Sequence, residues 1–294
     1  MLVDISEGWG NVDLHEDRPV LPFVGDHHWK PNHKVQCEVR EVRHRTRICT
    51  RHFWKYQWLD TEVLKEEPVL LVFRNLFSKR HVAKLLEDAK QYSLQPLSAL
   101  DNNGKPMRNS AVRIANGTWI RHDDTDAFEK AMRRAEAMIP HVNFRNSEEW
   151  QLSRYTTGDH FAPHYDYLNF EMKGDLQMMR YGNRFATFYV VLQNAIRGGH
   201  TIFPFLRRKP WMRPGDVIFW TNMDVEGKQE LGVLNAGCVV RKGEKIDLTL
   251  WIREKDQDIR LSPLKQGVFD LQKLTHPDPK LLGKCRLPLW TVYI

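Results

Sequence analysis

The chain has 294 residues, a length that fits two average domains or one β-rich domain with long tails. Hydrophobic residues make up 41% and aromatic residues 11% of the sequence, which is enough for a packed core and excludes a largely disordered or collagen-like chain. The net charge of +7 suits an acidic ligand or partner but is too small to indicate a nucleic-acid-binding surface. No apolar run approaches the length of a membrane-spanning helix, so we expect no membrane span.

The first 48 residues predict an irregular N-terminal arm. They are rich in His, Pro, Asp and Trp and show no sustained hydrophobic period. The start of the chain has neither a basic nor an apolar region, so we expect no signal peptide in it. Basic residues then recur at a spacing that fits one face of a strand, and we interpret them as a charged edge strand: Arg43, Arg45, Arg47 and Arg51.

A short strand and two helices are predicted next. The apolar run from Pro68 to Phe73 indicates a strand. Ser78 can cap a helix over residues 78–91, and a second helix follows Asp124 and ends before Pro140. The apolar stripes of the two helices are Val82, Leu85, Leu86 and Ala89, and Phe128, Ala131, Met132, Ala135 and Met138.

After about residue 149 the sequence predicts short strands rich in aromatic and β-branched residues. These strands are 151–155, 184–193, 201–205, 216–221 and 246–253. Helices followed by a run of strands indicate an α+β fold with helices packed on a β-sandwich or barrel. We place one domain over residues 49–262 and a C-terminal tail over residues 263–294.

One segment carries chemistry-bearing residues at a spacing typical of a metal site. His164 and Asp166 are two residues apart, so on a strand both side chains point to the same side. An imidazole and a carboxylate on one side can converge on one metal ion, and two histidines with one carboxylate form the facial triad of non-haem Fe(II) oxygenases. A lone His-x-Asp motif is weak, because it occurs by chance in many chains.

The motifs around this pair make it more specific. The run Gly198 to Pro204 is followed by Arg213 to Trp220, by Asn235 to Lys245 and by Thr249 to Ile252. In this order and spacing, the segment from about Cys49 to Arg253 resembles the catalytic domain of the prolyl 4-hydroxylase α-subunit family. The resemblance implies a double-stranded β-helix (jelly roll) with helices packed outside. It also implies Fe(II), 2-oxoglutarate, O₂ and ascorbate, with hydroxylation of prolines in a peptide.

The residues that the resemblance places in the site depart from the family pattern. His164 and Asp166 match the first two iron ligands, but the family's second histidine is Asn235 here. The lysine that anchors the distal carboxylate of 2-oxoglutarate is matched by Leu250, beside Thr249. The family's tyrosine three residues before the first ligand is Phe161.

Each departure weakens the expected site. A carboxamide oxygen is a weaker donor to Fe(II) than a neutral imidazole. Period two puts Ile246, Leu248, Leu250 and Ile252 on one apolar face of a strand, which we expect to point into the barrel. A 2-oxoglutarate carboxylate buried there would have no cation. Two histidines and three arginines are left as candidates for a replacement ligand or cation: His160, His200, Arg180, Arg184 and Arg241.

The sequence therefore predicts a member of the family with a degenerate site. We expect it to be inactive or impaired and to act as a peptide-binding or partner subunit. The alternative is an active peptidyl-proline hydroxylase that uses a compensating ligand. The resemblance implies a proline-containing peptide or collagen-like chain as the bound partner, with a homodimer, an active homologous subunit or protein disulfide isomerase as further partners. We expect no nucleic-acid partner.

The four cysteines form no Cys-x-x-Cys pair, so a zinc cluster is not expected. From the residues alone, two disulfides and four free thiols both remain possible. The resemblance implies a disulfide from Cys238 to the C-terminal tail, where Cys285 could serve, and leaves Cys37 and Cys49 as the second pair. It also implies the endoplasmic reticulum lumen if a signal peptide is missing from this chain, and the cytoplasm otherwise. Asn116, followed by Gly and Thr, is a candidate glycosylation site.

Overall fold

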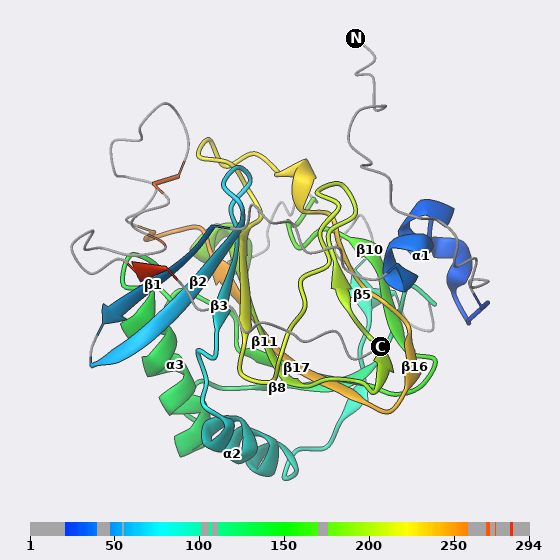
Figure 1. The fold of residues 1–294 in the computed structure, drawn as a ribbon, viewed down its shortest axis with the longest axis horizontal. Coiled ribbons are helices and arrows are strands. Elements are labelled where there is room, and N and C mark those ends of the chain that lie inside the picture. Colours follow the sequence, from blue (N-terminus) through cyan, green and yellow to red (C-terminus); the bar gives the residue numbers. More distant parts are fainter. Residues whose placement is uncertain are drawn as a thin grey trace.

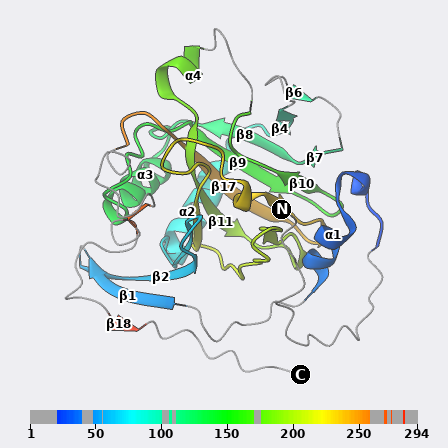
Figure 2. The same ribbon diagram turned by 90° about the horizontal axis from the view of Figure 1, so that it is seen from above.

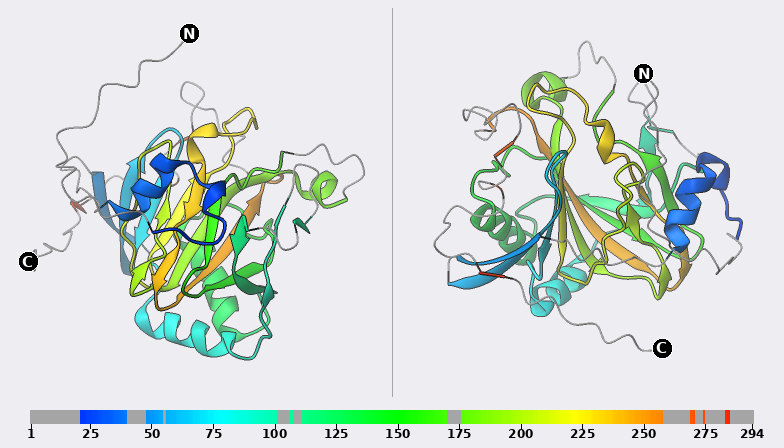
Figure 3. Two further views of the ribbon diagram at one scale, coloured as in Figure 1. Left: turned by 90° about the vertical axis from the view of Figure 1, so that its right-hand side faces the viewer. Right: turned by 45° about the horizontal axis from the view of Figure 1, so that its top comes forward.

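Two antiparallel sheets face each other and form a double-stranded β-helix, as the sequence predicts (Figures 1 and 3). The structure is a computed structural model that describes residues 21–39, 48–54, 56–100, 106–107, 111–169, 176–257, 269–270, 274 and 283–284. No helix within these residues is long and apolar enough to cross a membrane.

The large sheet has ten strands and the small sheet has four. In spatial order, the large sheet consists of β18 (Gly283–Lys284), β1 (Ile48–Trp54), β2 (Gln57–Lys65), β3 (Leu70–Arg74), β14 (Val217–Thr221), β11 (Arg184–Gln193), β17 (Lys245–Arg253), β9 (Trp150–Tyr155), β8 (Asn116–Ile120) and β4 (Gln95–Pro96). The small sheet consists of β13 (Thr201–Ile202), β15 (Asn235–Gly237), β10 (His160–His164) and β7 (Arg113–Ile114). Two further strand pairs are β12 (Arg197–Gly198) with β16 (Val240–Lys242), and β5 (Ala99–Leu100) with β6 (Pro106–Met107).

Helices α2 (Lys79–Ala89) and α3 (Asp126–Met138) cover the outer face of the large sheet (Figure 1). The side chains of Ser78 and Thr125 accept hydrogen bonds from backbone N–H groups in the first turns, so both helices begin at a side-chain cap. The apolar stripes of both helices pack into the main hydrophobic cluster. Both predicted helices are confirmed, with the start of the second shifted to Asp126. Within the described part of the chain, the other named helical segments are η1 (Asp26–His28), α1 (Pro31–Glu38), α4 (Leu176–Tyr181) and η2 (Leu231–Val233).

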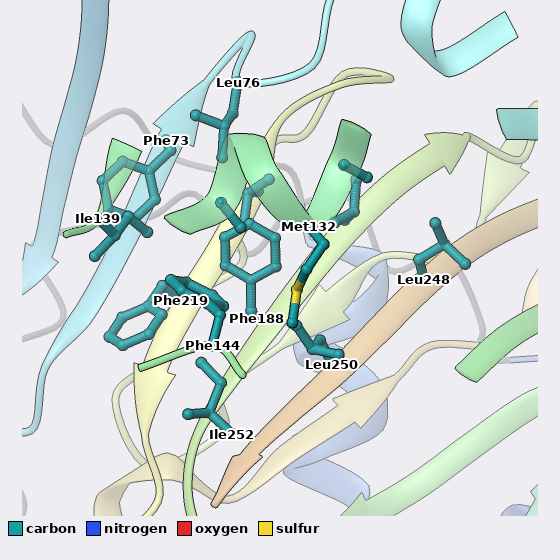
Figure 4. Close-up of a cluster of buried hydrophobic side chains, with 14 of the residues drawn as sticks. Phe73, Leu76, Met132, Ile139, Phe144, Phe188, Phe219, Leu248, Leu250 and Ile252 are labelled. Carbon is teal, nitrogen blue, oxygen red and sulfur yellow. The ribbon is translucent and has the colours of Figure 1, made fainter. Parts of the chain in front are cut away.

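Strand β17 is buried on both faces, and its apolar face packs on the helices. Leu248, Leu250 and Ile252 belong to the cluster that contains Met132 of α3 and Phe188 of β11 (Figure 4). The prediction that this face points into the barrel is wrong. A buried apolar face can lie on either side of a covered sheet, and here it meets the apolar stripes of α2 and α3. The other face of β17 therefore lines the space between the sheets.

The N-terminal segment is not irregular throughout, because it contains the helix α1. Its described part, residues 21–39, lies against the small sheet, on the side opposite α2 and α3 (Figures 1 and 2). Trp29 packs with Ala162, Ile202 and Ala236 in a separate hydrophobic cluster. Of the predicted row of arginines, Arg51 pairs with Asp60 on the neighbouring strand at 2.6 Å, and the others lie outside the described residues.

A disulfide joins α1 to the small sheet. Cys37 bonds to Cys238, with their Cα atoms 5.7 Å apart. The expected pairs Cys37–Cys49 and Cys238–Cys285 are therefore wrong, because the packing of α1 brings Cys37 beside the strand end that carries Cys238. Cys49 is also disulfide-bonded, and Cys285 lies outside the described residues.

Peptide mapping under non-reducing conditions tests this pairing. We expect a linked peptide that contains Cys37 and Cys238. The double variant Cys37→Ser/Cys238→Ser should lose about 2–5 kcal/mol of unfolding free energy, because the bond closes a long loop of the unfolded chain. A linked peptide that contains Cys37 and Cys49 would contradict the fold of the N-terminal segment.

The position of Leu250 makes a second prediction. Leu250→Lys places an ammonium group in an apolar cluster without a partner, so it should lower the unfolding free energy by about 3–5 kcal/mol. Leu250→Met, which keeps a similar apolar volume, should cost less than about 1.5 kcal/mol. Urea unfolding of the two variants measures the difference. Equal stabilities would show that residue 250 faces a polar space.

Candidate functional site

A small recess with a cavity volume of about 40 Å³ lies between the two sheets and is partly open to solvent. It combines ionisable groups with aromatic walls from strands of both sheets. Its lining includes Arg113, Tyr155, Phe161, His164, Asp166, Tyr189, Trp220, Asn235, Gly237, Lys245, Asp247, Thr249 and Trp251. The three positions at which the resemblance expects iron ligands all line this recess: His164, Asp166 and Asn235.

His164 and Asp166 converge at one end of this recess. His164 Nε2 lies 3.5 Å from Asp166 Oδ1. The Nδ1 atom of His164 lies 2.9 Å from the carbonyl oxygen of Ala162, and a hydrogen bond there places a proton on Nδ1. The second oxygen of Asp166 accepts a hydrogen bond of 2.7 Å from the hydroxyl of Thr187. In the neutral tautomer, an imidazole lone pair and a carboxylate oxygen thus face each other, an arrangement that binds a proton or a metal ion.

The surroundings of Asp166 favour the ionised form of its carboxyl group. Burial opposes ionisation, but the hydrogen bond and charge of His164, the charge of Arg184 and the hydroxyl of Thr187 together hold the pKa of Asp166 below its ordinary value. Arg184 itself is bound by both carboxylate oxygens of Glu148, at 2.7 and 2.8 Å. The carboxylate is thus fixed in place by neighbours that favour its charged form.

Asn235 lies directly across from His164 on the neighbouring strand β15. Its amide nitrogen donates long hydrogen bonds of 3.4 Å to the carbonyl oxygens of His164 and Val233. Within the described part of the chain, no group of three His, Cys, Asp or Glu side chains is placed to hold a metal ion. The structure thus brings together the two strong donors and places a carboxamide at the third position.

Phe161 joins this end of the recess to an arginine that the sequence did not reveal. Its ring stacks on the imidazole of His164, with ring centroids 3.5 Å apart and planes inclined by 14°. The guanidinium carbon of Arg113 lies 4.5 Å from the centroid of the Phe161 ring. Arg113 belongs to the two-residue strand β7, which is too short to give a periodic signal in the sequence.

The buried lysine of the recess is Lys245, at the start of β17. Its Nζ lies 3.7 Å from Asp247 Oδ2, and the hydroxyl of Tyr189 donates a hydrogen bond of 2.7 Å to the same carboxylate oxygen. Burial lowers the pKa of Lys245 and raises that of Asp247. The period-two pattern of β17 could have found this pair, if the apolar face had been assigned to the helices.

Thr249 and Leu250, the two β17 residues that the resemblance places at the cosubstrate site, lie on opposite faces of the strand. Thr249 lines the recess, whereas Leu250 lies in the helix-facing core and is absent from the lining. The interpretation that Leu250 replaces a recess cation is therefore corrected. The cation on this face of the strand is Lys245, and it has a carboxylate partner within the protein.

The imidazole of His160 contacts the N-terminal segment and does not line the recess. Its Nδ1 accepts a hydrogen bond of 3.1 Å from the indole of Trp29, and its Nε2 lies 2.9 Å from the carbonyl oxygen of Val24. The backbone is close here: Gly25 has φ of 85°, and a Cβ on it would lie 2.2 Å from the carbonyl oxygen of Ala111. Both ring nitrogens of His160 are occupied, so it does not replace the missing ligand.

His200 directly precedes β13 and is absent from the residues that line the recess. Burial, with smaller contributions from the charges of Lys209 and Lys245, lowers the pKa of His200 to about 4.

The three arginines considered as substitute cations have other contacts, and so none of them is the recess cation. Arg184 is bound by Glu148, Arg241 lies 3.0 Å from Glu38, and the guanidinium of Arg180 lies over the ring of Tyr181. The candidate glycosylation residue Asn116 is exposed at the start of β8, where its modification stays a prediction.

The residues present do not fit the two groups that the resemblance implies. A facial triad needs two histidines and a carboxylate, and the three matched positions offer one histidine, one carboxylate and an amide: His164, Asp166 and Asn235. The lysine that faces the recess is already paired with Asp247. The donor set is therefore incomplete for iron, and the charge of the lysine is not available to a 2-oxoglutarate carboxylate.

Comparisons with known proteins show which proteins this chain resembles. No family model matches the chain. It is 26% identical to prolyl 4-hydroxylase subunit alpha-2 of Caenorhabditis elegans over 230 residues, which cover 78% of this chain and 40% of that protein. It is 27% identical to prolyl 4-hydroxylase subunit alpha-3 of Homo sapiens over 206 residues, which cover 69% of this chain and 37% of that protein. The chain thus spans about two fifths of the length of these relatives.

Solved structures include similar chains. The viral collagen prolyl hydroxylase of Paramecium bursaria Chlorella virus 1, in its complex with 2OG, has a TM-score of 0.49 and 25% sequence identity, covering 63% of this chain and 95% of that chain. A prolyl-4-hydroxylase of Pseudomonas putida has a TM-score of 0.43 and 15% identity, covering 63% of this chain and 92% of that chain. The matches to curated sequences, with the jelly-roll fold of the chain itself, support a divergent prolyl 4-hydroxylase-like chain.

Proposed function

We propose that this chain is a prolyl 4-hydroxylase-like protein that has lost or weakened the hydroxylation reaction and acts as a peptide-binding or partner subunit. The observation that carries the proposal is the carboxamide of Asn235 at the third ligand position, opposite His164. The two nearby histidines offer no replacement, because His160 has contacts on both ring nitrogens and His200 is absent from the lining of the recess.

The chemistry of the donors supports impaired iron binding. Neutral imidazole suits Fe(II), whereas a carboxamide is better matched to hard cations such as Mg²⁺ and Ca²⁺. The amide nitrogen of Asn235 is also tied to two backbone carbonyl groups, so the side chain is positioned by the β15 backbone. His164 and Asp166 alone would hold iron weakly, and an active hydroxylase with a compensating ligand finds no candidate among the described residues.

The names of the similar proteins suggest which partner this chain binds. Because they are named prolyl 4-hydroxylase subunits, we propose a proline-containing peptide or a collagen-like chain as the bound partner. A homodimer, an active homologous subunit and protein disulfide isomerase are the proposed assembly partners. The Cys37–Cys238 disulfide supports a location in an oxidising compartment, and we propose the endoplasmic reticulum lumen.

Restoring the missing imidazole tests the proposal. Asn235→His should raise the affinity for Fe(II) by at least about tenfold over the wild-type chain, because it completes two histidines and one carboxylate. The measurement is an anaerobic Fe(II) titration of the full chain.

Asn235→Gln is the matched control, since it changes the size of the side chain but keeps the carboxamide. It should bind Fe(II) no better than the wild type. Tight, stoichiometric binding of Fe(II) by the wild-type chain would contradict the proposal and show that another residue supplies the third ligand.

The buried position of His200 predicts a pH dependence of stability. Its folded pKa of about 4 lies below the ordinary value of 6.5, so the unfolded chain binds the proton first as the pH falls. Stability is therefore lost from about pH 6.5 down to pH 4. At pH 5 this amounts to about 2 kcal/mol relative to pH 7.5.

His200→Gln removes this titration and should show a loss between pH 7.5 and pH 5 that is smaller by about the same 2 kcal/mol. Urea unfolding at the two pH values measures both chains. An identical pH dependence would mean that the imidazole is solvated, which would reopen its role as a recess ligand.

A further inference from the structure

Arg113 is a buried cation in the recess. No carboxylate among the described residues lies within ion-pair distance of it, and Asp247 interacts with it only through the longer-range field. Its side chain belongs to a residue that is 8% exposed. One terminal nitrogen donates hydrogen bonds of 2.7 Å to Gln151 and 3.1 Å to Ser153, both neutral groups. The Nε atom is buried and makes no hydrogen bond within the described part of the protein. A buried guanidinium in this state is strongly destabilising unless an anion compensates it.

The second cation of the recess differs, because Lys245 is compensated from within. Asp247 lies two residues further along the same face of β17 and is oriented by the hydroxyl of Tyr189. This carboxylate is almost fully buried, with 2% of its side chain exposed. The lysine and Asp247 together add no net charge to the recess, whichever of them holds the proton.

The remaining ionisable groups of the recess are also paired. Asp166 faces His164 and lies in the field of Arg184, which is bound by Glu148. Arg113 is therefore the lining cation that makes no direct hydrogen bond or ion pair to a carboxylate within the described part of the protein. Tyr155, Phe161, Trp220 and Trp251 supply aromatic walls, which suit the hydrocarbon part of a small acid.

We propose that the recess binds a small monocarboxylate through Arg113, and that Asp247 excludes dicarboxylates by occupying Lys245. A guanidinium binds a carboxylate through two parallel hydrogen bonds, and the partnerless Nε is one donor of such a pair. A second carboxylate on the ligand would meet Asp247 in a buried space, where like charges repel strongly. The inference rests on the proposed function, because it explains why the recess has left the cosubstrate chemistry of the family.

The recess has room for a ligand beside the lysine. A Cβ added to Gly237 would lie 3.5 Å from Cβ of Phe161 and 4.0 Å from Nζ of Lys245, which are ordinary van der Waals contacts. Gly237→Ala should therefore fold normally and narrow the recess without changing its charge. This variant separates the effect of volume from the effect of charge.

Binding of two acids of equal length tests the inference. Valerate carries one carboxylate and glutarate carries two, and both have five carbon atoms. The quench of tryptophan fluorescence reports binding, because Trp220 and Trp251 line the recess. The full chain is titrated with each acid in buffer that contains a chelator, so that no metal contributes. The wild-type chain should bind valerate at least about tenfold more tightly than glutarate.

Three variants assign the charges. Arg113→Gln should weaken valerate binding by at least about tenfold, and Arg113→Lys should retain more of it than Arg113→Gln does. Asp247→Asn should strengthen glutarate binding by at least about tenfold, because it frees Lys245 for the second carboxylate. Gly237→Ala should weaken the binding of both acids and preserve the preference for valerate over glutarate. Melting temperatures show that each variant is folded.

The outcomes are decisive in both directions. A wild-type preference for glutarate, unchanged valerate binding by folded Arg113→Gln, or no binding of either acid would overturn the inference. These measurements use metal-free protein, whereas the proposed function fails by tight Fe(II) binding to the wild-type chain. The two failures are therefore distinguishable.

Discussion

The alternation of side chains along β17 divides the interior of the protein into an apolar half and a charged half. Its even-numbered face packs on α2 and α3, while its odd-numbered face carries Lys245, Asp247 and Thr249 into the space between the sheets. A shift of one residue in the register of this strand would bury the charges against the helices and expose the leucines to the recess. The position of the candidate site thus depends on the same packing that forms the core.

Charge pairing within the recess follows from this division. Each buried charge needs a partner, because an unpaired ion in a low-dielectric interior is strongly unfavourable. The carboxylate of Asp247 provides that partner for Lys245, and His164 with Arg184 provides it for Asp166. Arg113 makes its described hydrogen bonds only to neutral groups, which makes it the natural contact for an anionic ligand. This distribution of charge is the basis of the ligand preference that we propose.

The missing imidazole and the internal ion pair have a common consequence for the chemistry. A reaction that needs iron and a bound dicarboxylate requires three ligands and an available cation, and the recess provides neither in full. The scaffold around them is nevertheless retained, with two sheets, two capped helices and the convergent His164–Asp166 pair. A retained scaffold without a complete donor set is compatible with a binding role, since function depends on the site rather than on the fold.

Local signals predicted much of this structure, and long-range packing determined the rest. Ser78, the apolar stripes and the His-x-Asp spacing act within a few residues, so the helices and the convergence of His164 with Asp166 could be predicted. The side of the sheet that Leu250 faces depends on helices that are distant in sequence, and the period of β17 allowed both choices. Cys37 meets Cys238 only because α1 packs on the small sheet, 201 residues away in sequence. Arg113 lies on a two-residue strand that leaves no periodic trace.

The central claim is that this recess does not support 2-oxoglutarate turnover. The most direct measurement is succinate release from 2-oxoglutarate by the purified full chain, supplied with Fe(II), ascorbate and a proline-containing peptide under air. We predict no succinate above the level released by iron and ascorbate alone. Peptide-dependent succinate release in proportion to the amount of protein would contradict the claim and establish the chain as an active dioxygenase.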